Sequence, residues 1–402
     1  MKYWFTRFSS AVLLSVSASA ATLLAGILIL RILDPDAAGE FTLVTSVAGM
    51  AGMVGLFGQN AIISRLYSRS QTPYNWPRDL TITVAYGSII IGLLLVAIRY
   101  YHSFTWMELV FVGGSAWLTV LIYAAAFMLN SHRHYVSSTL LLRLPNALFI
   151  IPVSLAMLGL VHMDVPFFLF SQILIGLVCA AAGLAGLFKF LPMGSNTIPW
   201  GMRKESFGFF LLMVIQLLID PGLIVMAGYF VRPGELAAFA GYMNLIRPFL
   251  LIWSILIQTL AVEYARDHTF PRKKLLLGMW GLAIPLFFIS WAVLPFLLDL
   301  LYSGKYNMIG PAALPISLLG ALLLTETVPR SYIAGCADDR TLQKYIRDQV
   351  ILTLISLVME ISLIMKLGVT GAAWGGCIML FARNLIAYTY LFRMTHQPIR
   401  SA

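Results

Sequence analysis

Apolar residues form long uninterrupted runs along this sequence, and short polar segments separate one run from the next. A run of about 20 apolar residues is long enough to cross the hydrocarbon core of a bilayer as an α-helix. The pattern predicts about twelve spanning helices, and no polar segment is long enough to form a separate water-soluble domain. The predicted spans are 9–31, 41–63, 81–98, 109–129, 141–161, 167–189, 207–230, 237–262, 275–299, 310–333, 347–366 and 368–392.

The first apolar run also has features of a secretory signal peptide. Lys2 and Arg7 precede it, and it contains the small residues Ser17-Ala18-Ser19-Ala20. However, the run continues to Leu30, which is longer than the apolar core of a signal peptide. We therefore expect it to be the first membrane-spanning helix.

A helix–turn–helix pattern near the start of the chain returns about half the chain length later. The acidic turn that begins Asp34-Pro35-Asp36 corresponds to Arg232-Pro233-Gly234, and an apolar run follows each turn. The alignment pairs Pro35 with Pro233, Phe41 with Phe239, and Asn60 with Gln258. A repeat at half length is typical of transporters built from two similar bundles.

The repeat predicts an all-α integral membrane protein with two six-helix lobes related by pseudo-two-fold symmetry. The expected N-terminal lobe is 1–190, and the expected C-terminal lobe is 207–402. Residues 191–206, which contain two prolines and two glycines, form the expected cytoplasmic linker.

Glycines recur every three residues in the second predicted span, at Gly49, Gly52, Gly55 and Gly58. Small residues on one side of a membrane helix permit close contact with a neighbouring helix. This spacing therefore predicts close packing or a bend in that span.

Composition and charge support a membrane protein. The chain of 402 residues is 60% hydrophobic and 11% charged, whereas soluble domains carry about 25% charged residues. With the N-terminus in the cytoplasm, cytoplasmic segments hold about four times as many Lys and Arg residues as outward segments, while acidic residues divide evenly. The net charge of +10 therefore indicates topology, with both termini cytoplasmic, and does not indicate nucleic-acid binding.

Charged residues inside the predicted spans are the candidate functional residues, because a charge within a bilayer usually faces a cavity or a partner. They are Asp220, Arg247, Glu326, Arg330, Glu360 and Arg383, while Arg31 and Arg143 lie at helix ends. The acids inside spans all fall in the second half, so no buried acid is expected in the first half.

Each of these charges also has a purely structural interpretation. Asp220 with Arg247, Glu360 with Arg383, and Glu326 with Arg330 one turn later would form ion pairs between or within helices. Arg31 and Arg143 would extend their side chains to the membrane interface.

The sequence offers no support for an enzyme, a metal site or a cofactor. The three cysteines have no paired spacing, the loop histidines have no further ligands nearby, and no nucleophile–base set is evident. We therefore expect a non-enzyme without a metal or cofactor.

Several motifs resemble the polysaccharide flippases of the multidrug/oligosaccharidyl-lipid/polysaccharide exporter superfamily. The segment 29–67 resembles the opening of these flippases, although Asp34 stands where the family has glycine. Segments 130–135, 335–340 and 366–374 resemble later family motifs. The positions that match the opening motif are Pro35, Gly39, Phe41, Gly58, Asn60 and Arg65.

The resemblance implies a flippase in the bacterial inner membrane. Its substrate would be an undecaprenyl-diphosphate-linked oligosaccharide for O-antigen, capsule or exopolysaccharide, and its partners would be membrane lipids, a polysaccharide polymerase and a chain-length regulator. Family members have a cationic cavity, for which Arg31, Arg143, Arg247 and Arg383 are the candidates, because the planar guanidinium suits phosphate. Asp220, Glu326 and Glu360 are the candidates for coupling transport to H⁺ or Na⁺.

Two other functions stay open at this point. A cation-coupled multidrug exporter of the same superfamily would need buried acids in the first half. A membrane-embedded polymerase or glycosyltransferase would need a large outward loop, and the outward loops here are short. A peptidoglycan-precursor flippase is not expected, because such flippases resemble this family but have two helices more than the twelve predicted here.

Overall fold

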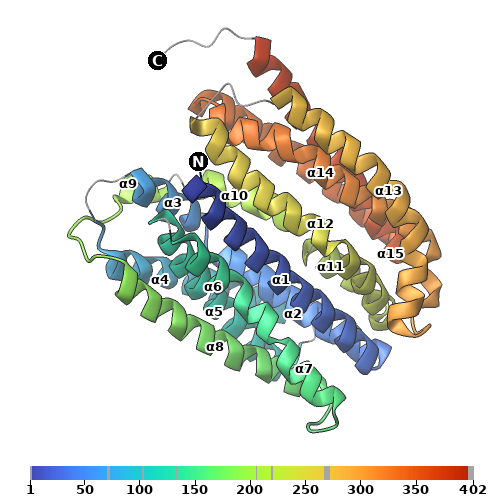
Figure 1. The fold of residues 1–402 in the computed structure, drawn as a ribbon. Coiled ribbons are helices and arrows are strands. Elements are labelled where there is room, and N and C mark those ends of the chain that lie inside the picture. The colour runs from blue at the N-terminus through green and yellow to red at the C-terminus, as the bar shows by residue number, and fades with distance from the viewer. Residues whose placement is uncertain are drawn as a thin grey trace. The chain divides into compact units, whose positions relative to one another are not determined.

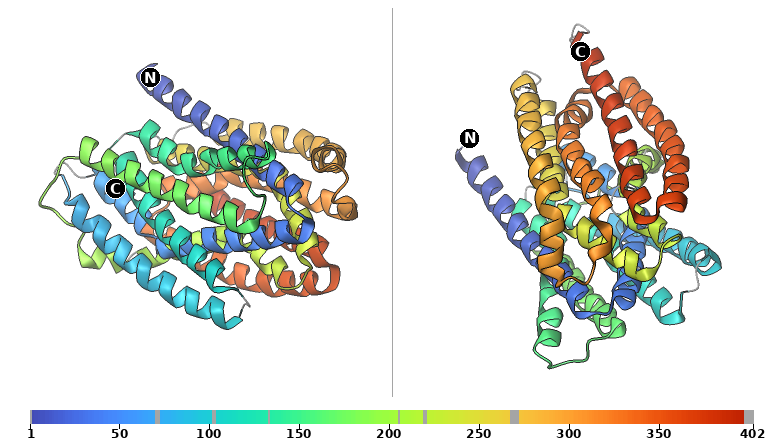
Figure 2. Two further views of the ribbon diagram at one scale, coloured as in Figure 1. Left: turned by 90° about the horizontal axis from the view of Figure 1, so that it is seen from below. Right: turned by 90° about the vertical axis from the view of Figure 1, so that its right-hand side faces the viewer.

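A computed structural model describes residues 2–69, 73–101, 104–132, 134–204, 206–218, 221–266 and 272–396. These residues form α-helices and one 3₁₀ helix, with no β-strand among them (Figure 1). The chain divides into two compact units, Met1–Leu217 and Leu218–Ala402, which we call unit 1 and unit 2. Figure 2 shows the same helices from two further directions.

The described residues of unit 1 form ten helices. They are α1 (Lys2–Ile32), α2 (Pro35–Gly55), α3 (Gln59–Arg69), α4 (Trp76–Tyr101), α5 (Trp106–Ser131), α6 (Tyr135–Leu148), α7 (Ile150–Met157), α8 (Val165–Phe190), α9 (Trp200–Lys204) and α10 (Ser206–Leu217). The predicted lobe limits, 1–190 and 207–402, stay a prediction, and the observed division assigns α10 to unit 1.

In unit 2 the part of the chain that the structure describes forms five α-helices and the 3₁₀ helix. They are α11 (Pro221–Gly228), α12 (Pro233–Arg266), α13 (Arg272–Tyr302), η1 (Asn307–Ala312), α14 (Ala313–Cys336) and α15 (Asp339–His396). α15 is a hairpin of two arms, because the backbone turns at Gly368, where φ is 58° and ψ is −135°.

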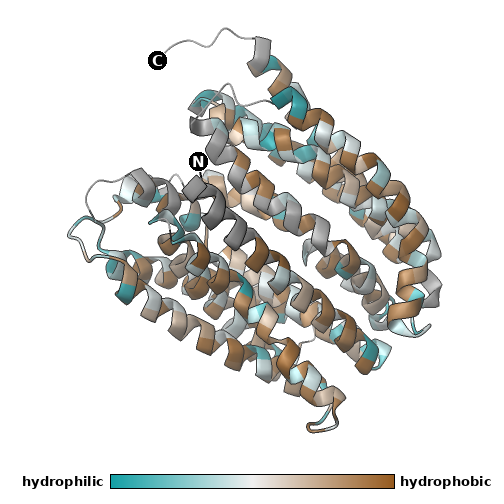
Figure 3. Cartoon of the chain, viewed as in Figure 1, coloured by the Kyte–Doolittle hydropathy of each residue, from teal (hydrophilic) through white to brown (hydrophobic). Residues whose placement is uncertain are grey.

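Among the described residues, 8 helices are long and apolar enough to cross a membrane, or up to 9 when a bent pair counts as one span. α15 counts once although it contains two predicted spans, and α1 contributes the shorter apolar segment Val16–Ile32. Hydrophobic residues cover the helices of both units, and many of the hydrophilic residues lie near helix ends (Figure 3). The prediction of an all-α, multi-pass membrane protein is confirmed.

Each unit is built around one central helix. In the most apolar window of each helix, 61% of α5 and 78% of α14 is buried, but only 17% of α4 and 17% of α13. α5 and α14 contain the fourth predicted span of each half, and α4 and α13 contain the third. Corresponding helices therefore occupy corresponding places, as the sequence repeat predicts.

The aligned turns of the repeat have the same local structure. Pro35 and Pro233 are the first residues of α2 and α12, a position that suits proline because its fixed φ is helical and its missing N–H would have no partner there. Phe41 and Phe239 are both buried. The side chain of Gln258, which aligns with Asn60, lies outside the described residues.

The glycine series of the second predicted span marks both close packing and a break. A Cβ on Gly52 would lie 2.6 Å from Thr119 Cβ, and one on Gly55 would lie 2.9 Å from Val120 Cγ2, so α2 packs directly on α5. Phe57 and Gly58 have φ of 47° and 70°, which ends α2 and starts α3 in a new direction. Both outcomes agree with the prediction from the glycine spacing.

A buried acid, Asp79, lies in the first turn of α4. Its carboxylate accepts a hydrogen bond from Tyr67 Oη at 3.0 Å and one from the guanidinium of Arg203 at 2.5 Å. Both charged side chains are almost fully buried. Burial and the neighbouring Asp79 raise the pKa of Tyr67, so its hydroxyl stays protonated and donates at neutral pH.

We expect Asp79→Ala to destabilise unit 1 by about 3–5 kcal/mol, because Arg203 would be left as a buried charge without its partner. The check is the midpoint of thermal unfolding of the purified protein in detergent. Asp34→Ala is the matched control, since Asp34 is exposed and its side chain makes no capping hydrogen bond to α2. Unfolding of Asp79→Ala at the wild-type temperature would contradict the prediction.

Candidate functional site

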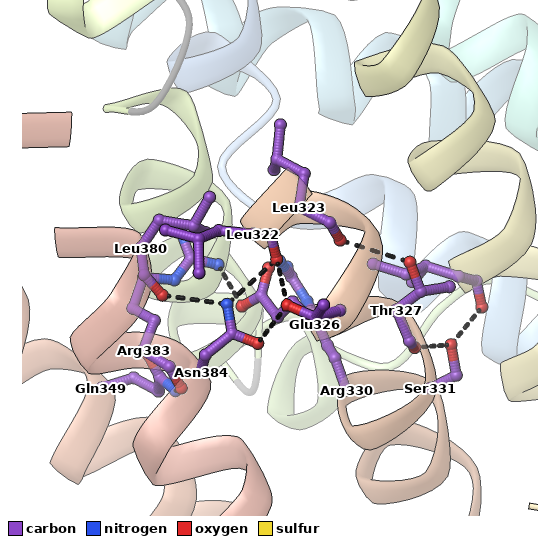
Figure 4. A network of polar contacts seen from close by, with 12 residues as sticks. Leu322, Leu323, Glu326, Thr327, Arg330, Ser331, Gln349, Leu380, Arg383 and Asn384 are labelled. Carbon is purple, nitrogen blue, oxygen red and sulfur yellow. Dashed lines mark hydrogen bonds and ion pairs between the residues drawn. The ribbon is translucent and has the colours of Figure 1, made fainter. Parts of the chain in front are cut away.

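Three charged side chains meet inside unit 2 (Figure 4). Arg383, on the second arm of α15, donates a hydrogen bond from Nη2 to Glu326 Oε1 of α14 at 2.9 Å. Arg330, one turn after Glu326, forms an ion pair with Glu326 Oε2 at 3.8 Å. Glu326 and Arg383 are buried, and the side chain of Arg330 is 15% exposed. Two guanidinium groups therefore share one carboxylate, and we call this group the unit 2 charge cluster.

Polar side chains around the cluster connect α14 with both arms of α15. Asn384 Nδ2 donates to the carbonyls of Leu322 at 3.0 Å and Leu380 at 3.1 Å. Gln349 Nε2, on the first arm, donates to the carbonyl of Arg383 at 3.3 Å. These bonds hold the backbone that carries Arg383, so the position of its guanidinium is set by three helical segments.

Arg330 also contacts an aromatic ring of α12. Its guanidinium carbon lies 5.2 Å from the centroid of the Trp253 ring, within the range of a cation–π interaction. The indole is buried. The cluster is thus connected to α12 as well as to α14 and α15, and its cations lie between helices of unit 2.

Glu360 differs from Glu326 in its surroundings. It lies on the first arm of α15 and is fully buried. Among the described residues, neither of its carboxylate oxygens has a hydrogen-bond partner. The second arm passes so close at Gly375 that a Cβ there would lie 2.4 Å from Glu360 Cγ. Glycine at 375 therefore makes room for the Glu360 side chain between the two arms.

The remaining candidates are not gathered at the cluster. Arg31 is exposed in the last turn of α1, and Arg143 is partly buried in α6. None of the ion pairs found among the described residues includes Arg143. Asp220 and the side chain of Arg247 lie outside the described residues.

The pairing of the buried charges differs in part from the sequence-based interpretation. Glu326 and Arg330 do lie on one face of α14, as their spacing predicts. The suggested pair of Glu360 with Arg383 is wrong, because Arg383 bonds to Glu326. Glu360 points between the arms of α15 instead, where Gly375 receives it.

The expectation that the first half holds no buried acid is also wrong. Asp79 is fully buried, and Glu108 is 5% exposed in the first turn of α5. Glu108 Oε2 accepts hydrogen bonds from the backbone N–H and hydroxyl of Thr105 in a capping box. Both acids start helices, where an apolar-run analysis treats them as loop residues, and neighbouring segments cover them.

Three residues that contact the unit 2 charge cluster were not predicted from the sequence. Asn384 interrupts an apolar run, which is a signal in the sequence, whereas Gln349 follows Arg347 and Asp348 at the polar start of a run and gives none. Trp253 gave no signal, because an aromatic residue in an apolar run is ordinary in a membrane helix.

Comparisons with known proteins identify the fold. No family model and no curated protein matches the sequence. Among solved structures, the lipid II flippase MurJ in an inward closed conformation is similar with a TM-score of 0.66 at 14% identity, covering 97% of this chain and 88% of that chain. A MATE protein in complex with MaL6 has a TM-score of 0.67 at 13% identity, covering 98% and 96%.

A third similar structure is a MOP superfamily transporter from Pyrococcus furiosus whose binding pocket is described as having reverse polarity. It has a TM-score of 0.62 at 15% identity and covers 96% of each chain. These identities show the fold alone, which is that of MOP transporters, with twelve helices in two lobes. The predicted fold class is confirmed.

We expect Glu326→Ala to destabilise unit 2 by about 3–5 kcal/mol, because a buried Arg383 would lose its counter-ion. The double variant Glu326→Leu/Arg383→Leu should recover much of this loss, because it removes the two most deeply buried charges and leaves only the partly exposed Arg330. Thermal unfolding of both variants in detergent measures the difference. Arg340→Ala, at an exposed position, is the control. A double variant less stable than Glu326→Ala would contradict this account of the pair.

Proposed function

We propose that this protein is a flippase for lipid-linked oligosaccharides. It would move undecaprenyl-diphosphate-linked polysaccharide repeat units from the cytoplasmic to the periplasmic leaflet by alternating access. The repeat units would be used to build O-antigen, capsule or exopolysaccharide. The similarity of fold to a lipid II flippase over 97% of the chain supports this class of substrate.

The observation that carries the proposal is the unit 2 charge cluster, in which two guanidinium groups meet at one buried carboxylate. A diphosphate needs a polar, preferably cationic path, because a bare charge within a bilayer costs at least about 2.5–3.5 kcal/mol. Guanidinium groups bind phosphate oxygens through two parallel hydrogen bonds. The cluster thus offers the chemistry that a diphosphate headgroup requires.

In this proposal Arg383 and Arg247 contact the diphosphate or anionic sugars, and Arg31 and Arg143 are further contacts along the path. The apolar polyprenyl chain stays in the lipid. The guanidinium of Arg383, which binds Glu326 in this structure, would leave Glu326 and bind the incoming phosphate.

Coupling to an ion gradient is the proposed role of the buried acids Asp220, Glu326 and Glu360. Glu360 is the strongest of these candidates, because it is fully buried and its oxygens have no hydrogen-bond partner among the described residues. A buried carboxylate of this kind is costly unless a cation joins it. Binding of H⁺ or Na⁺ would remove that cost and link ion flow to the conformation of α15.

The proposal also places the protein in the bacterial inner membrane with both termini in the cytoplasm, as the Lys and Arg distribution predicts. A polysaccharide polymerase and a chain-length regulator are the proposed partners. No chemical step is assigned to the protein itself.

A multidrug exporter is the alternative, since MATE proteins are as similar in fold as the flippase. The two buried acids of unit 1 do not favour it. Asp79 is neutralised by Arg203, and Glu108 caps α5. The substrates separate the two functions, since an exporter of organic cations would protect cells from such compounds and leave surface polysaccharide unchanged.

We expect Arg383→Ala and Arg247→Ala each to abolish surface polysaccharide when expressed in a host lacking its own flippase, because the diphosphate would lose a cationic contact. Immunoblots of membrane fractions check that each variant is present, and gels of extracted polysaccharide measure the product. Arg340→Ala should leave the product unchanged.

Loss of stability is separated from loss of binding by the neutral pair Arg383→Gln/Glu326→Gln, which removes the unpaired buried charge. The pair should be present in the membrane but inactive. Normal polysaccharide from this pair, or from both single Ala variants, would rule out the proposed role of the arginines.

We expect Glu360→Gln to abolish stimulation of transport by an ion gradient, because glutamine keeps the shape of the side chain but binds neither H⁺ nor Na⁺ as a carboxylate does. The measurement is movement of lipid-linked oligosaccharide in proteoliposomes with an imposed H⁺ or Na⁺ gradient. Glu235→Gln, an exposed position in the first turn of α12, is the matched control. Unaltered stimulation in Glu360→Gln would exclude Glu360 as the coupling group.

A further inference from the structure

The crossover between α8 and α10, residues 191–204, is fastened to unit 1 by a buried polar cluster centred on Asp79. Arg203 of α9 donates to Asp79 Oδ1 at 2.5 Å, and the backbone N–H of Ile198 donates to the same oxygen at 3.3 Å. The other oxygen accepts from Tyr67 of α3. One carboxylate therefore ties α3 and α4 to two points of the crossover.

A second connection runs through Gln59, the first residue of α3. Arg203 Nη1 donates to Gln59 Oε1 at 2.9 Å, and Gln59 Nε2 donates to Ser206 Oγ at 3.1 Å. Gln59, Arg203 and Ser206 are all buried. The start of α10 is thus held by the same cluster as α9.

Backbone hydrogen bonds fix the first part of the crossover beside the start of α4. Asn75 N–H donates to the Asn196 carbonyl at 2.6 Å, and Gly194 N–H donates to the Tyr74 carbonyl at 3.1 Å. Tyr74 and Asn196 form an isolated parallel β-bridge. Any side chain at position 194 would collide with the Pro73 carbonyl, so glycine is required there.

α10 is also packed tightly on the break between α2 and α3. The Phe57 ring lies 4.5 Å from the Phe210 ring, measured between centroids. Gly58 approaches the Ser206 carbonyl so closely that a Cβ would lie 2.3 Å from it. The positive φ of Phe57 and Gly58 turns this part of the chain toward α10.

A flexible tether needs none of these features. Exposed polar residues suffice for a tether, and burying an arginine and an aspartate costs free energy that only a fixed, well-formed pair offsets. The buried pair, the backbone bonds and the close contacts at two glycines all hold the crossover in one place.

We propose that residues 191–204 and α10 stay attached to α3 and α4 throughout transport, with Asp79 and Arg203 as the clamp. The crossover is then a fixed part of unit 1 and not a flexible linker between the lobes. The inference rests on the proposed function in one respect, which is that the two lobes move against each other by alternating access.

A disulfide between Tyr74→Cys and Asn196→Cys tests the proposal, in a protein whose Cys179, Cys336 and Cys377 are changed to Ala. Paired strands lie about 4.7–4.9 Å apart, and a disulfide accepts Cα distances of about 4.4–6.8 Å. Oxidation with copper phenanthroline in proteoliposomes should link the two cysteines to the same high yield with and without lipid-linked oligosaccharide and an ion gradient. The linked protein should transport at the rate of the reduced protein. Single-cysteine variants are the controls for the link.

Loss of transport on oxidation, reversed by dithiothreitol, would overturn the proposal, as would a yield that falls under one of the conditions. If the reduced protein moves no lipid-linked oligosaccharide, the proposed function fails. The yield with and without an ion gradient still decides whether the crossover detaches. Phe57→Cys with Phe210→Cys, linked by a short bismaleimide, gives the same test at α10 should Tyr74→Cys not fold. Arg203→Met should lower the yield at 74 and 196, and an unchanged yield would show that Arg203 is not part of the clamp.

Discussion

The hydrocarbon core of a membrane holds no water, so every polar group within it must be satisfied by the protein. This constraint explains why the chain is helical and why charges inside its spans are paired. Arg383 and Arg330 share Glu326 inside the predicted spans of unit 2. Asp79 and Arg203 lie outside the predicted spans, where the protein itself covers them, and they form a buried pair for the same reason. Glu360 departs from the pattern, because its oxygens have no hydrogen-bond partner among the described residues. This departure is the basis of the coupling role that we propose for Glu360.

The two units follow one plan but place their charges differently. α5 and α14 are the central helices, and α4 and α13 lie outside them. In unit 1 the buried charges are at helix ends, where they fasten the crossover and cap α5. In unit 2 they lie between α14 and α15, inside the bundle. The two units thus differ in their buried charges. Those of unit 1 hold structural elements together, whereas those of unit 2 are the candidate binding residues.

The fold could be predicted from sequence because its signals are local. Apolar run length set the spans, Pro35 and Pro233 marked the duplicated turns, and the glycine series marked the break at Gly58. Charge pairing was less predictable, because it joins residues that are distant in sequence. The pair of Glu326 with Arg330 was predicted correctly, because the two residues are one helix turn apart. The partner of Arg383 was predicted wrongly, because Arg383 pairs with Glu326 and not with Glu360. Asp79 and Arg203 lie 124 residues apart, and the sequence around either residue gives no signal that the two form a pair.

The tight turn at Gly368 has a consequence for how the protein is made. It connects the two arms of α15 without a polar loop, and the arms touch at Gly371, where a Cβ would lie 2.0 Å from the Leu363 carbonyl oxygen. An arm inserted alone would leave that surface facing lipid, so the close contact favours insertion of both arms together. In the orientation that the Lys and Arg distribution predicts, Lys366 is the charged side chain nearest this turn that would have to cross the bilayer, and a single lysine costs about 2.5–3.5 kcal/mol. We therefore expect the hairpin to enter the membrane as one piece.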